Sequence, residues 1–365
     1  MFKHGLKIHF THRPFQWSSE ARGKAAVHCV IIGFGLQDVA EKWLFDYDTP
    51  KSEPHAMKAA NINPYLVDGP NVVVGKRSKP LCAVPEMRKG SQPTDGGHLL
   101  LTDAERKELL ALEPAASRWI RPFLGSEEFI NGINRWCLWL TDCPPEELRR
   151  MPEVLQRVEA VRTMRLASKK AATREWAMRP SIFTEDRQPD SNYLLIPSVS
   201  SENRSYTPIG FMPPEVIASN LVLTIPHATT YHFGVLQSTM HMAWMRTVCG
   251  RLKSDYRYSA SIVYNTFPWP EPTDKQRAAI ETAAQAVLDT RAQFPAATLA
   301  DLYDPLTMPP VLLKAHQQLD RAVDAAYVAK SFKTEAERVA FLFTRYQQLI
   351  GKTVPCAPRP LSPPC

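Results

Sequence analysis

The chain contains no Cys-x-x-Cys pair and no His-x-x-x-His cluster, so it offers neither a zinc ribbon nor a thioredoxin-type site. Its seven cysteines are irregularly spaced, as is typical of reduced thiols in a cytoplasm. No apolar run reaches the ~18–20 residues of a membrane span, and the N-terminus "MFKHGLKIHF" lacks the apolar core of a signal peptide. These absences predict a cytoplasmic protein with no metal and no membrane partner.

Familiar catalytic motifs are missing too. No Gly-x-Ser-x-Gly elbow presents a nucleophile, and adjacent carboxylates such as Glu127 and Glu128 lie in polar surroundings typical of a solvated surface. "VIIGFG" at 30–35 indicates either a nucleotide-binding turn without its third glycine or simply a strand end. "INPYL" at 62–66 indicates either a single-proline version of the Asn-Pro-Pro-Tyr loop of amino-methyltransferases or a turn.

The chain has 365 residues, enough for two or three domains of roughly 100–200 residues, and a net charge of +7 that is compatible with a polyanionic partner. Two strands are expected within residues 1–35, and the second, "AAVHCVIIGF", is as apolar as a strand buried on both faces. Two strands alone are marginally stable, so we expect the chain to begin inside a domain whose earlier strands are absent.

Short strands and loops are expected from residue 36 to about 270, interrupted by a mostly helical segment at 102–175 and an apolar helix at 234–250 ended by Gly250. From Asp274 to about Leu349 the apolar periodicity predicts helices. The Pro-rich residues 351–365 are expected to be disordered.

Three polar segments are candidates for binding. Nine Lys/Arg against five Glu between Glu146 and Arg179 indicate either a solvated helix face or a phosphate-contacting one. The loop "SVSSENRSYTPIGF" at 198–211 is either a polar hairpin loop or a phosphate grip. Its candidate phosphate donors are Ser200, Ser201, Asn203 and Arg204.

The third segment, "RLKSDYRYS" at 251–259, places Arg251, Lys253, Asp255 and Arg257 on alternate positions, which share one face of a strand. Arg and Lys donate to guanine O6 and N7, and Asp accepts from cytosine N4, so such a face could read base pairs. Lys253 and Asp255 could equally neutralise one another at a solvent-exposed edge.

Long segments of this chain resemble the MmeI-like DNA methyltransferases, single-chain restriction-modification enzymes that methylate adenine N6. The resemblance covers about residues 2–350 and rests on segments that include "KHGLKIHFTHRPFQWSSEARGKAAVHCVIIGF", "NINPYLVDGPNVVV", "WIRPFLGSEEFINGINRWCLWL" and "FGVLQSTMHMAWMRTVCGRLKSDYRYSASIVYNTFPWP".

The resemblance implies an α/β fold with the last strands of a Rossmann-like methyltransferase sheet at 1–45. A mixed α+β target-recognition domain at 46–270, a helical bundle at 274–350 and the tail at 351–365 would follow. The family's S-adenosylmethionine loop and its Asn-Pro-Pro-Tyr/Phe loop lie upstream, so we expect no cofactor to be bound by this chain alone.

The resemblance also implies double-stranded DNA as the partner and favours base contacts by Lys253, Asp255 and Arg257. Arg251 and Asn220 are further candidates for base contact. Phe15 and Trp17 match the position of an aromatic that stacks on the flipped base, with core packing as the alternative.

We therefore expect a DNA-specificity portion of an adenine-N6 methyltransferase. One alternative is a protein-interaction module that does not bind DNA. Another is half of an active methyltransferase whose other half is a separate chain.

Overall fold

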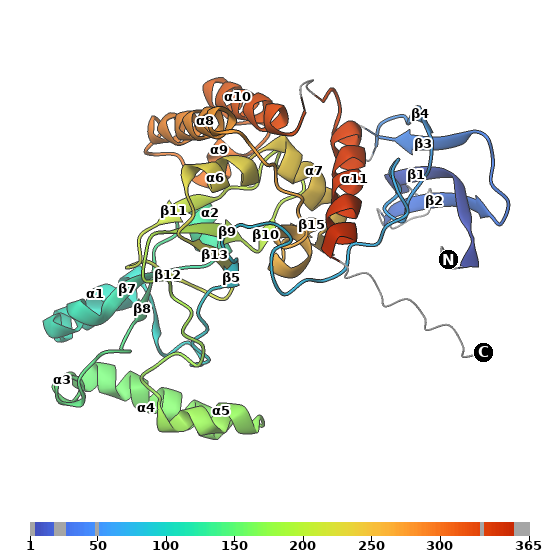
Figure 1. The fold of residues 1–365 in the computed structure, drawn as a ribbon. Helices are drawn as coiled ribbons and strands as arrows, with labels where there is room; N and C mark the ends of the chain where they lie inside the picture. The colour runs from blue at the N-terminus through green and yellow to red at the C-terminus, as the bar shows by residue number, and fades with distance from the viewer. Residues whose placement is uncertain (1–3, 18–26, 48–50, 329–331, 354–365) are drawn as a thin grey trace, which may run out of the picture.

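The computed structural model describes residues 4–17, 27–47, 51–328 and 332–353, which form several small sheets and a helical C-terminal region. Figure 1 shows the N-terminal sheet at one side, α11 (Glu335–Thr353) between it and the body, and a helical lobe at the opposite end. Within the described residues, no helix combines the length and apolar content needed to cross a bilayer.

The N-terminal sheet has four strands in the order β2-β1-β3-β4. β1 pairs antiparallel with β2 and parallel with β3, and β3 pairs antiparallel with β4. Their bounds are β1 (Lys7–Trp17), β2 (Val27–Gly35), β3 (Lys42–Asp46) and β4 (His55–Ala59). The two strands expected in the first 35 residues are therefore present, and they join a larger sheet.

The centre of the body is an antiparallel sheet in the order β11-β9-β13-β5. Its strands are β5 (Arg88–Lys89), β9 (Tyr193–Pro197), β11 (Gly210–Met212) and β13 (Val222–Pro226). β9 is buried along its whole length, as its apolar sequence "YLLIP" requires.

A second sheet, in the order β12-β7-β8-β6, forms the base of the lobe. Its strands are β6 (Leu100–Thr102), β7 (Ile120–Leu124), β8 (Arg135–Leu138) and β12 (Ile217–Ala218). The lobe helices are α1 (Asp103–Leu112), η2 (Pro114–Trp119), α2 (Ser126–Asn131), α3 (Pro145–Arg149), α4 (Pro152–Leu166), α5 (Ala171–Glu175) and η3 (Trp176–Met178). The expected helical segment at 102–175 thus also contains strands, because β7 and β8 pair with each other.

A third sheet of three short strands, β10-β15-β14, lies at the edge of the body near α11. Its strands are β10 (Val199–Ser200), β14 (Gly250–Leu252) and β15 (Asp255–Arg257). A π-helical turn, η4 (Ala260–Tyr264), follows β15 where the sequence pattern favours a strand.

The apolar helix expected at 234–250 is two helices, α6 (Thr230–Leu236) and α7 (Thr239–Val248). Ser238 separates them because its side chain accepts the His241 N–H and caps α7. Gly250 does not end a helix but begins β14.

The C-terminal helices share one core with the central sheet and α6–α7. They are α8 (Asp274–Ala292), α9 (Leu299–Leu302), α10 (Pro310–Tyr327) and α11, and Thr273 caps α8 through a capping box with Gln276. At Gly234 in α6 an added Cβ would lie 2.8 Å from Ile280, so glycine permits α6 and α8 to pack closely. The predicted tail begins inside α11, and its residues 354–365 lie outside the described part of the chain.

Candidate functional site

The segment 251–257 is a tight hairpin and not one continuous strand. β14 and β15 pair antiparallel, with Arg251 opposite Tyr256 and Leu252 opposite Asp255. Lys253 occupies the turn with a φ of 56°, and the Arg251 guanidinium donates to the Ser254 carbonyl oxygen at 2.7 Å. The local chain therefore reverses direction at the residue expected in the middle of a strand.

The hairpin geometry shows that the four charged residues do not share one face, as was expected for a single strand. Directly opposite residues in an antiparallel pair share a face, so Arg251 lies with Tyr256, and its guanidinium stands 4.1 Å from that ring. Asp255 and Arg257 share the other face, and Lys253 stands at the tip. Lys253 and Arg257 are exposed, whereas Asp255 is half-buried and accepts the Glu202 N–H at 3.3 Å.

The loop after β10 supplies the wall beside the hairpin. β10 pairs with β15, so Ser200 lies opposite the buried Tyr256, and Ser200 is only 4% exposed. That burial takes the Ser200 hydroxyl off the surface where a phosphate contact was expected. Ser201 and Arg204 are half-buried and Asn203 is exposed.

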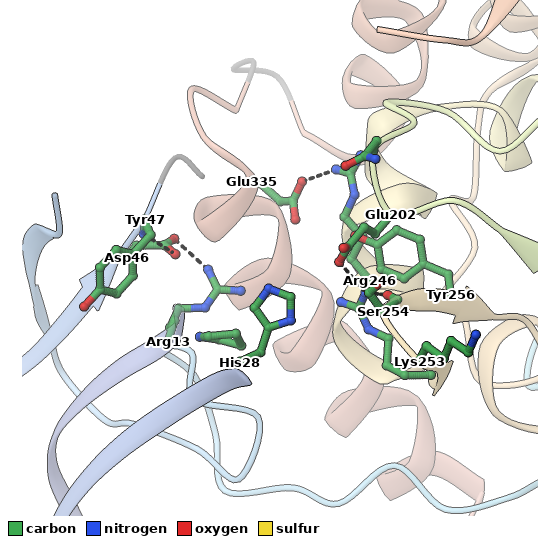
Figure 2. Close-up of a pocket in the computed structure, with 13 residues that line it drawn as sticks. Arg13, His28, Asp46, Tyr47, Glu202, Arg246, Lys253, Ser254, Tyr256 and Glu335 are labelled. Atoms are coloured by element: carbon green, nitrogen blue, oxygen red, sulfur yellow. Dashed lines mark hydrogen bonds and ion pairs between the residues drawn. The ribbon is translucent and has the colours of Figure 1, made fainter. Parts of the chain in front are cut away.

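A cleft of about 670 Å³ separates the hairpin from the N-terminal sheet. Figure 2 shows the two walls, with Arg13, His28 and Asp46 on one side and Glu202, Lys253 and Tyr256 on the other. Asn203 and Arg251 also line the cleft, so the N-terminal sheet, the loop after β10, α7, the hairpin and the start of α11 meet there. Of the residues expected to bind, those with side chains at this cleft are Asn203, Arg251 and Lys253.

Three ion pairs balance the charges of the cleft. Arg13 Nη1 lies 2.6 Å from Asp46, Arg251 Nη1 lies 3.6 Å from Glu202, and Arg246 in α7 pairs with Glu335 at the start of α11. The cleft walls are therefore not uniformly basic.

Burial and neighbouring charges shift the pKa values of the groups behind this surface. Burial acts to lower the pKa of Arg246, but the Glu335 carboxylate and the Tyr256 hydroxyl outweigh it, so the pKa is raised. Burial lowers the pKa of Arg204, although Asp255 acts in the opposite direction. Burial also raises the pKa of the Tyr256 hydroxyl, so Tyr256 presents a neutral hydroxyl to its neighbours.

The two aromatic candidates differ in their surroundings. Phe15 stacks on Tyr47 with ring centroids 5.4 Å apart, next to His12, and is half-buried. Trp17, at the end of β1, is 57% exposed. Phe15 therefore packs within the sheet, while the indole of Trp17 is open to a ligand.

Asn220 lies in the turn between β12 and β13 and is half-buried. This turn connects to the hairpin through Ser198, whose N–H donates to Leu221 and whose carbonyl accepts from Tyr258. The backbone thus links the Asn220 turn to the end of β15.

The two weak motifs adopt ordinary structural roles. Gly33 and Gly35 lie within β2, paired with β1, and a Cβ at Gly33 would fall 2.1 Å from the Phe10 ring. These glycines make room for side chains of β1 and do not form the turn that would hold S-adenosylmethionine. Asn63 is fully buried and its Oδ1 accepts the Tyr65 N–H, so "INPYL" is a turn.

The fold and the site define a class of protein: a small N-terminal β-sheet joined to a mixed α/β body that presents a hairpin at a cleft. The family comparisons give the same division. Residues 68–271 match the family described as MmeI, target recognition domain. Residues 272–354 match MmeI, C-terminal domain, and residues 1–46 match MmeI, DNA-methyltransferase domain. The chain belongs to the MmeI family.

Two relatives support this assignment. DNA methyltransferase A of Bacillus subtilis (strain 168) is 40% identical over 350 residues, which are 96% of this chain and 39% of that protein. The solved structure of the Type IIL restriction-modification enzyme MmeI in complex with DNA matches with a TM-score of 0.85 and 52% identity. That match covers 95% of this chain and 46% of the MmeI chain, so this chain spans less than half the length of either relative.

Several cleft residues were not found from the sequence. Glu202 lies within the polar loop, but it is an acid and not a phosphate donor. Arg13, Arg246 and Glu335 come from segments whose sequences show no binding pattern. Only the tertiary arrangement brings these residues to one cleft.

Proposed function

We propose that this chain is the target-reading portion of a DNA adenine-N6 methyltransferase and binds double-stranded DNA through the hairpin β14–β15. The observation that carries the proposal is the hairpin at the edge of the cleft, with Lys253 exposed at its tip and Arg257 exposed beside the half-buried Asp255. A two-stranded ribbon fits the major groove of B-DNA. A DNA partner also supports a cytoplasmic location.

The hairpin carries the hydrogen-bonding groups that base reading requires. Lys253 and Arg257 can donate to guanine O6 and N7, and Asp255 can accept from cytosine N4. Arg251 and Asn220 are proposed as adjacent contacts, Arg251 from the hairpin itself and Asn220 from the turn joined to it through Ser198.

Two other surfaces are proposed to bind DNA phosphates independently of the base sequence. Beside the hairpin, Ser201, Asn203 and Arg204 are the proposed phosphate contacts, and Ser200 is left out because it is buried. In the lobe, the exposed cations of α3 to η3 are candidates: Arg149, Arg150, Arg162, Lys169, Lys170, Arg174 and Arg179. Figure 1 places these helices far from the N-terminal sheet, so they would hold a different part of the duplex.

Exchange of the charges at the hairpin tests the proposal. The double variant Lys253→Glu with Asp255→Arg should change the preferred base pair at one position of the recognised site. The original pair should become less favourable by ~1–3 kcal/mol. Selection of bound duplexes from a random library, with wild type and variant in parallel, measures the change.

A matched control exchanges the exposed Lys107 with its ion-pair partner, the half-buried Asp103, on α1, which lies in the lobe away from the cleft. The control should keep the wild-type consensus. An unchanged consensus in the hairpin variant would refute base reading by these residues. Wild-type duplex binding that does not weaken with salt would instead favour a protein-interaction module.

A specific observation favours a methyltransferase half as a further partner. The N-terminal sheet exposes apolar side chains that a complete methyltransferase fold would cover: Phe10, Val30, Ile31 and Phe34. We infer that this sheet is completed by the remaining methyltransferase strands and helices, either in a longer polypeptide or in a separate chain. S-adenosylmethionine would bind to that half and supply the methyl group, and Trp17, or less readily Phe15, would stack on the extruded base.

Transfer of labelled methyl groups from S-adenosylmethionine to duplex DNA tests this second part. The chain alone should be inactive, and addition of a methyltransferase half should give labelling at adenine N6. Labelling by the chain alone would contradict the assignment of cofactor binding to the other half.

A further inference from the structure

The loop of residues 201–205 beside the hairpin has little apolar packing to hold it. Ser205 and Asn203 are exposed, and Glu202 and Arg204 are half-buried. Inside the loop, Ser201 accepts the Asn203 N–H through its hydroxyl and the Arg204 N–H through its carbonyl. Polar contacts from outside the loop must therefore determine where it lies relative to the hairpin.

On the side away from the hairpin those contacts come from one side chain, Arg246 of α7. Its Nη2 donates to the Ser205 carbonyl oxygen at 3.0 Å and to the Arg204 carbonyl oxygen at 3.4 Å. Its Nη1 donates to the Glu335 carboxylate at the start of α11, as Figure 2 shows. The Tyr256 hydroxyl of the hairpin interacts with the same guanidinium.

The loop in turn holds the hairpin. The Glu202 N–H donates to Asp255 Oδ1 at 3.3 Å, and the Glu202 carboxylate lies 3.6 Å from Arg251. A continuous set of contacts therefore runs from α11 through Arg246 and the loop to Asp255. Its outer members are the residues assigned above to base and phosphate contact.

We propose that Arg246 is a positioning residue for target recognition, held in place by Glu335, and that it sets the relative position of the 201–205 loop and the hairpin. Arg246 itself needs no contact with a base. A planar guanidinium suits this role because it can donate in several fixed directions at once. α11 thereby becomes part of the recognition apparatus, although it lies about 80 residues further along the chain than the hairpin. This inference rests on the proposed function.

The variant Arg246→Met tests the inference because methionine keeps the aliphatic length and removes every donor. The probes are the duplex that wild-type protein selects and duplexes that differ from it at the single base pair read by the hairpin. The ratio of affinities between them should fall roughly five- to tenfold, since the loop that holds Asp255 through the Glu202 N–H is no longer fixed by Arg246. The salt dependence of binding to unrelated duplex should stay as in wild type, because phosphate contacts in the lobe remain.

Arg338→Met is the matched control. Arg338 belongs to α11 and pairs with Asp324 of α10 at 2.6 Å in a more buried position, and its hydrogen bonds within the described residues go to Asp324 and Thr334, away from the loop and the hairpin. This control should lose stability without losing discrimination when both proteins are assayed well below their unfolding temperatures. Equal loss of discrimination in both variants would mean that Arg246 acts only through general stability, and the inference would be wrong.

Two further variants keep the test decisive if Arg246→Met does not fold. Glu335→Gln keeps the donors of Arg246 but removes the charge that orients them, so discrimination should fall by a smaller factor, about two- to threefold. Arg246→Lys keeps the charge but not the fork, so it should rescue stability and leave discrimination impaired. Full discrimination in both of these variants would overturn the inference. Failure of wild-type protein to discriminate between the duplexes would instead refute the proposed function.

Discussion

The N-terminal sheet and the body to which it is attached differ in how they bury apolar surface. In the sheet region the buried apolar core consists of Ile8, Leu44 and Ile62. In the body one continuous core joins the central sheet to α6, α7, α8, α10 and α11. Exposed apolar residues are correspondingly concentrated in the first region: Phe10, Trp17, Val30, Ile31, Phe34 and Leu36.

The body therefore has a core large enough to be stable by itself, whereas the N-terminal sheet depends on its neighbours. Buried apolar area contributes roughly 25 cal/mol per Å², and a core of three residues cannot offset the cost of ordering four strands. The loop after β4 is tied to the sheet by the bridge of Ile8 to Ile62, and a groove lies between β3, β4 and the start of α11. The four predictions below test this contrast, from the largest expected effect to the smallest.

The largest effect is expected at Arg165 in α4, a fully buried side chain of the body. Its guanidinium donates to five backbone carbonyl oxygens, those of Pro93, Thr94, Trp176, Arg179 and Ile182. Arg165→Met leaves these carbonyls without a donor and should lower the free energy of unfolding by about 3–5 kcal/mol in urea titrations. Arg162→Met, on the exposed face of the same helix, is the control and should change it by less than about 0.5 kcal/mol.

An isoleucine-to-alanine substitution in each region compares how much the buried side chain stabilises the body and the N-terminal sheet. Ile225→Ala in β13 should lower the free energy of global unfolding by about 2–5 kcal/mol, because Ile225 is buried in the continuous core. Ile62→Ala should mainly speed amide hydrogen exchange in β1–β4 and leave exchange in β9 and β13 unchanged. Equal loss of protection in both regions would show that the sheet and the body unfold as one unit.

Acidification should lower the free energy of unfolding of the body because a buried histidine, His241, is neutral in the folded state. Burial lowers the pKa of His241 to about 3, and its Nε2 lies 3.0 Å from the Tyr258 hydroxyl. In the unfolded chain the pKa is about 6.5. Between these values the unfolded state binds the proton and the folded state does not, so the titration of His241 leaves stability unchanged above about pH 6.5 and lowers it progressively as the pH falls below that value.

His241→Gln isolates this contribution. From pH 7 to pH 5, wild-type protein should lose about 2 kcal/mol more of its free energy of unfolding than this variant does, at 1.36 kcal/mol per unit of pKa difference. Urea titrations at the two pH values measure the difference. Parallel losses in both proteins would contradict a neutral His241 in the folded state.

The smallest effect is expected at Ile31 in β2, which is 44% exposed. Ile31→Thr keeps the branched side chain that favours a strand, so it should change the stability of the chain by less than about 0.5 kcal/mol. Solubility should rise as the apolar face shrinks, which light scattering measures. A large loss of stability would mean that this face is already covered by contacts within the chain.

Local sequence patterns predicted much of the fold. The strands expected at the N-terminus appear as β1 and β2, and the periodic segments after Thr273 appear as α8, α10 and α11. The break between α6 and α7 was hidden by a continuous apolar run, because both helices are buried on nearly all sides. Hydrophobic periodicity gives no boundary where every face is buried.

The candidate site was predicted only in part. Lys253, Asp255 and Arg257 were selected from their spacing and from the family resemblance, but a single strand was the wrong geometry. The turn at Lys253–Ser254 contains no glycine, asparagine or proline, and Ser254 followed by Asp255 is only a weak local signal for it. Pairing of β15 with β10, more than 50 residues away, accompanies the reversal.

The sequence by itself determined the family and many of the elements, because strand patterns, helix periodicity and long matching segments are local properties of the chain. Only the tertiary structure decided which charged side chains meet. Each of the ion pairs Arg13–Asp46, Arg251–Glu202 and Arg246–Glu335 joins segments between 33 and 89 residues apart. Contacts at such separations depend on how the sheets and helices pack, and no local pattern encodes them.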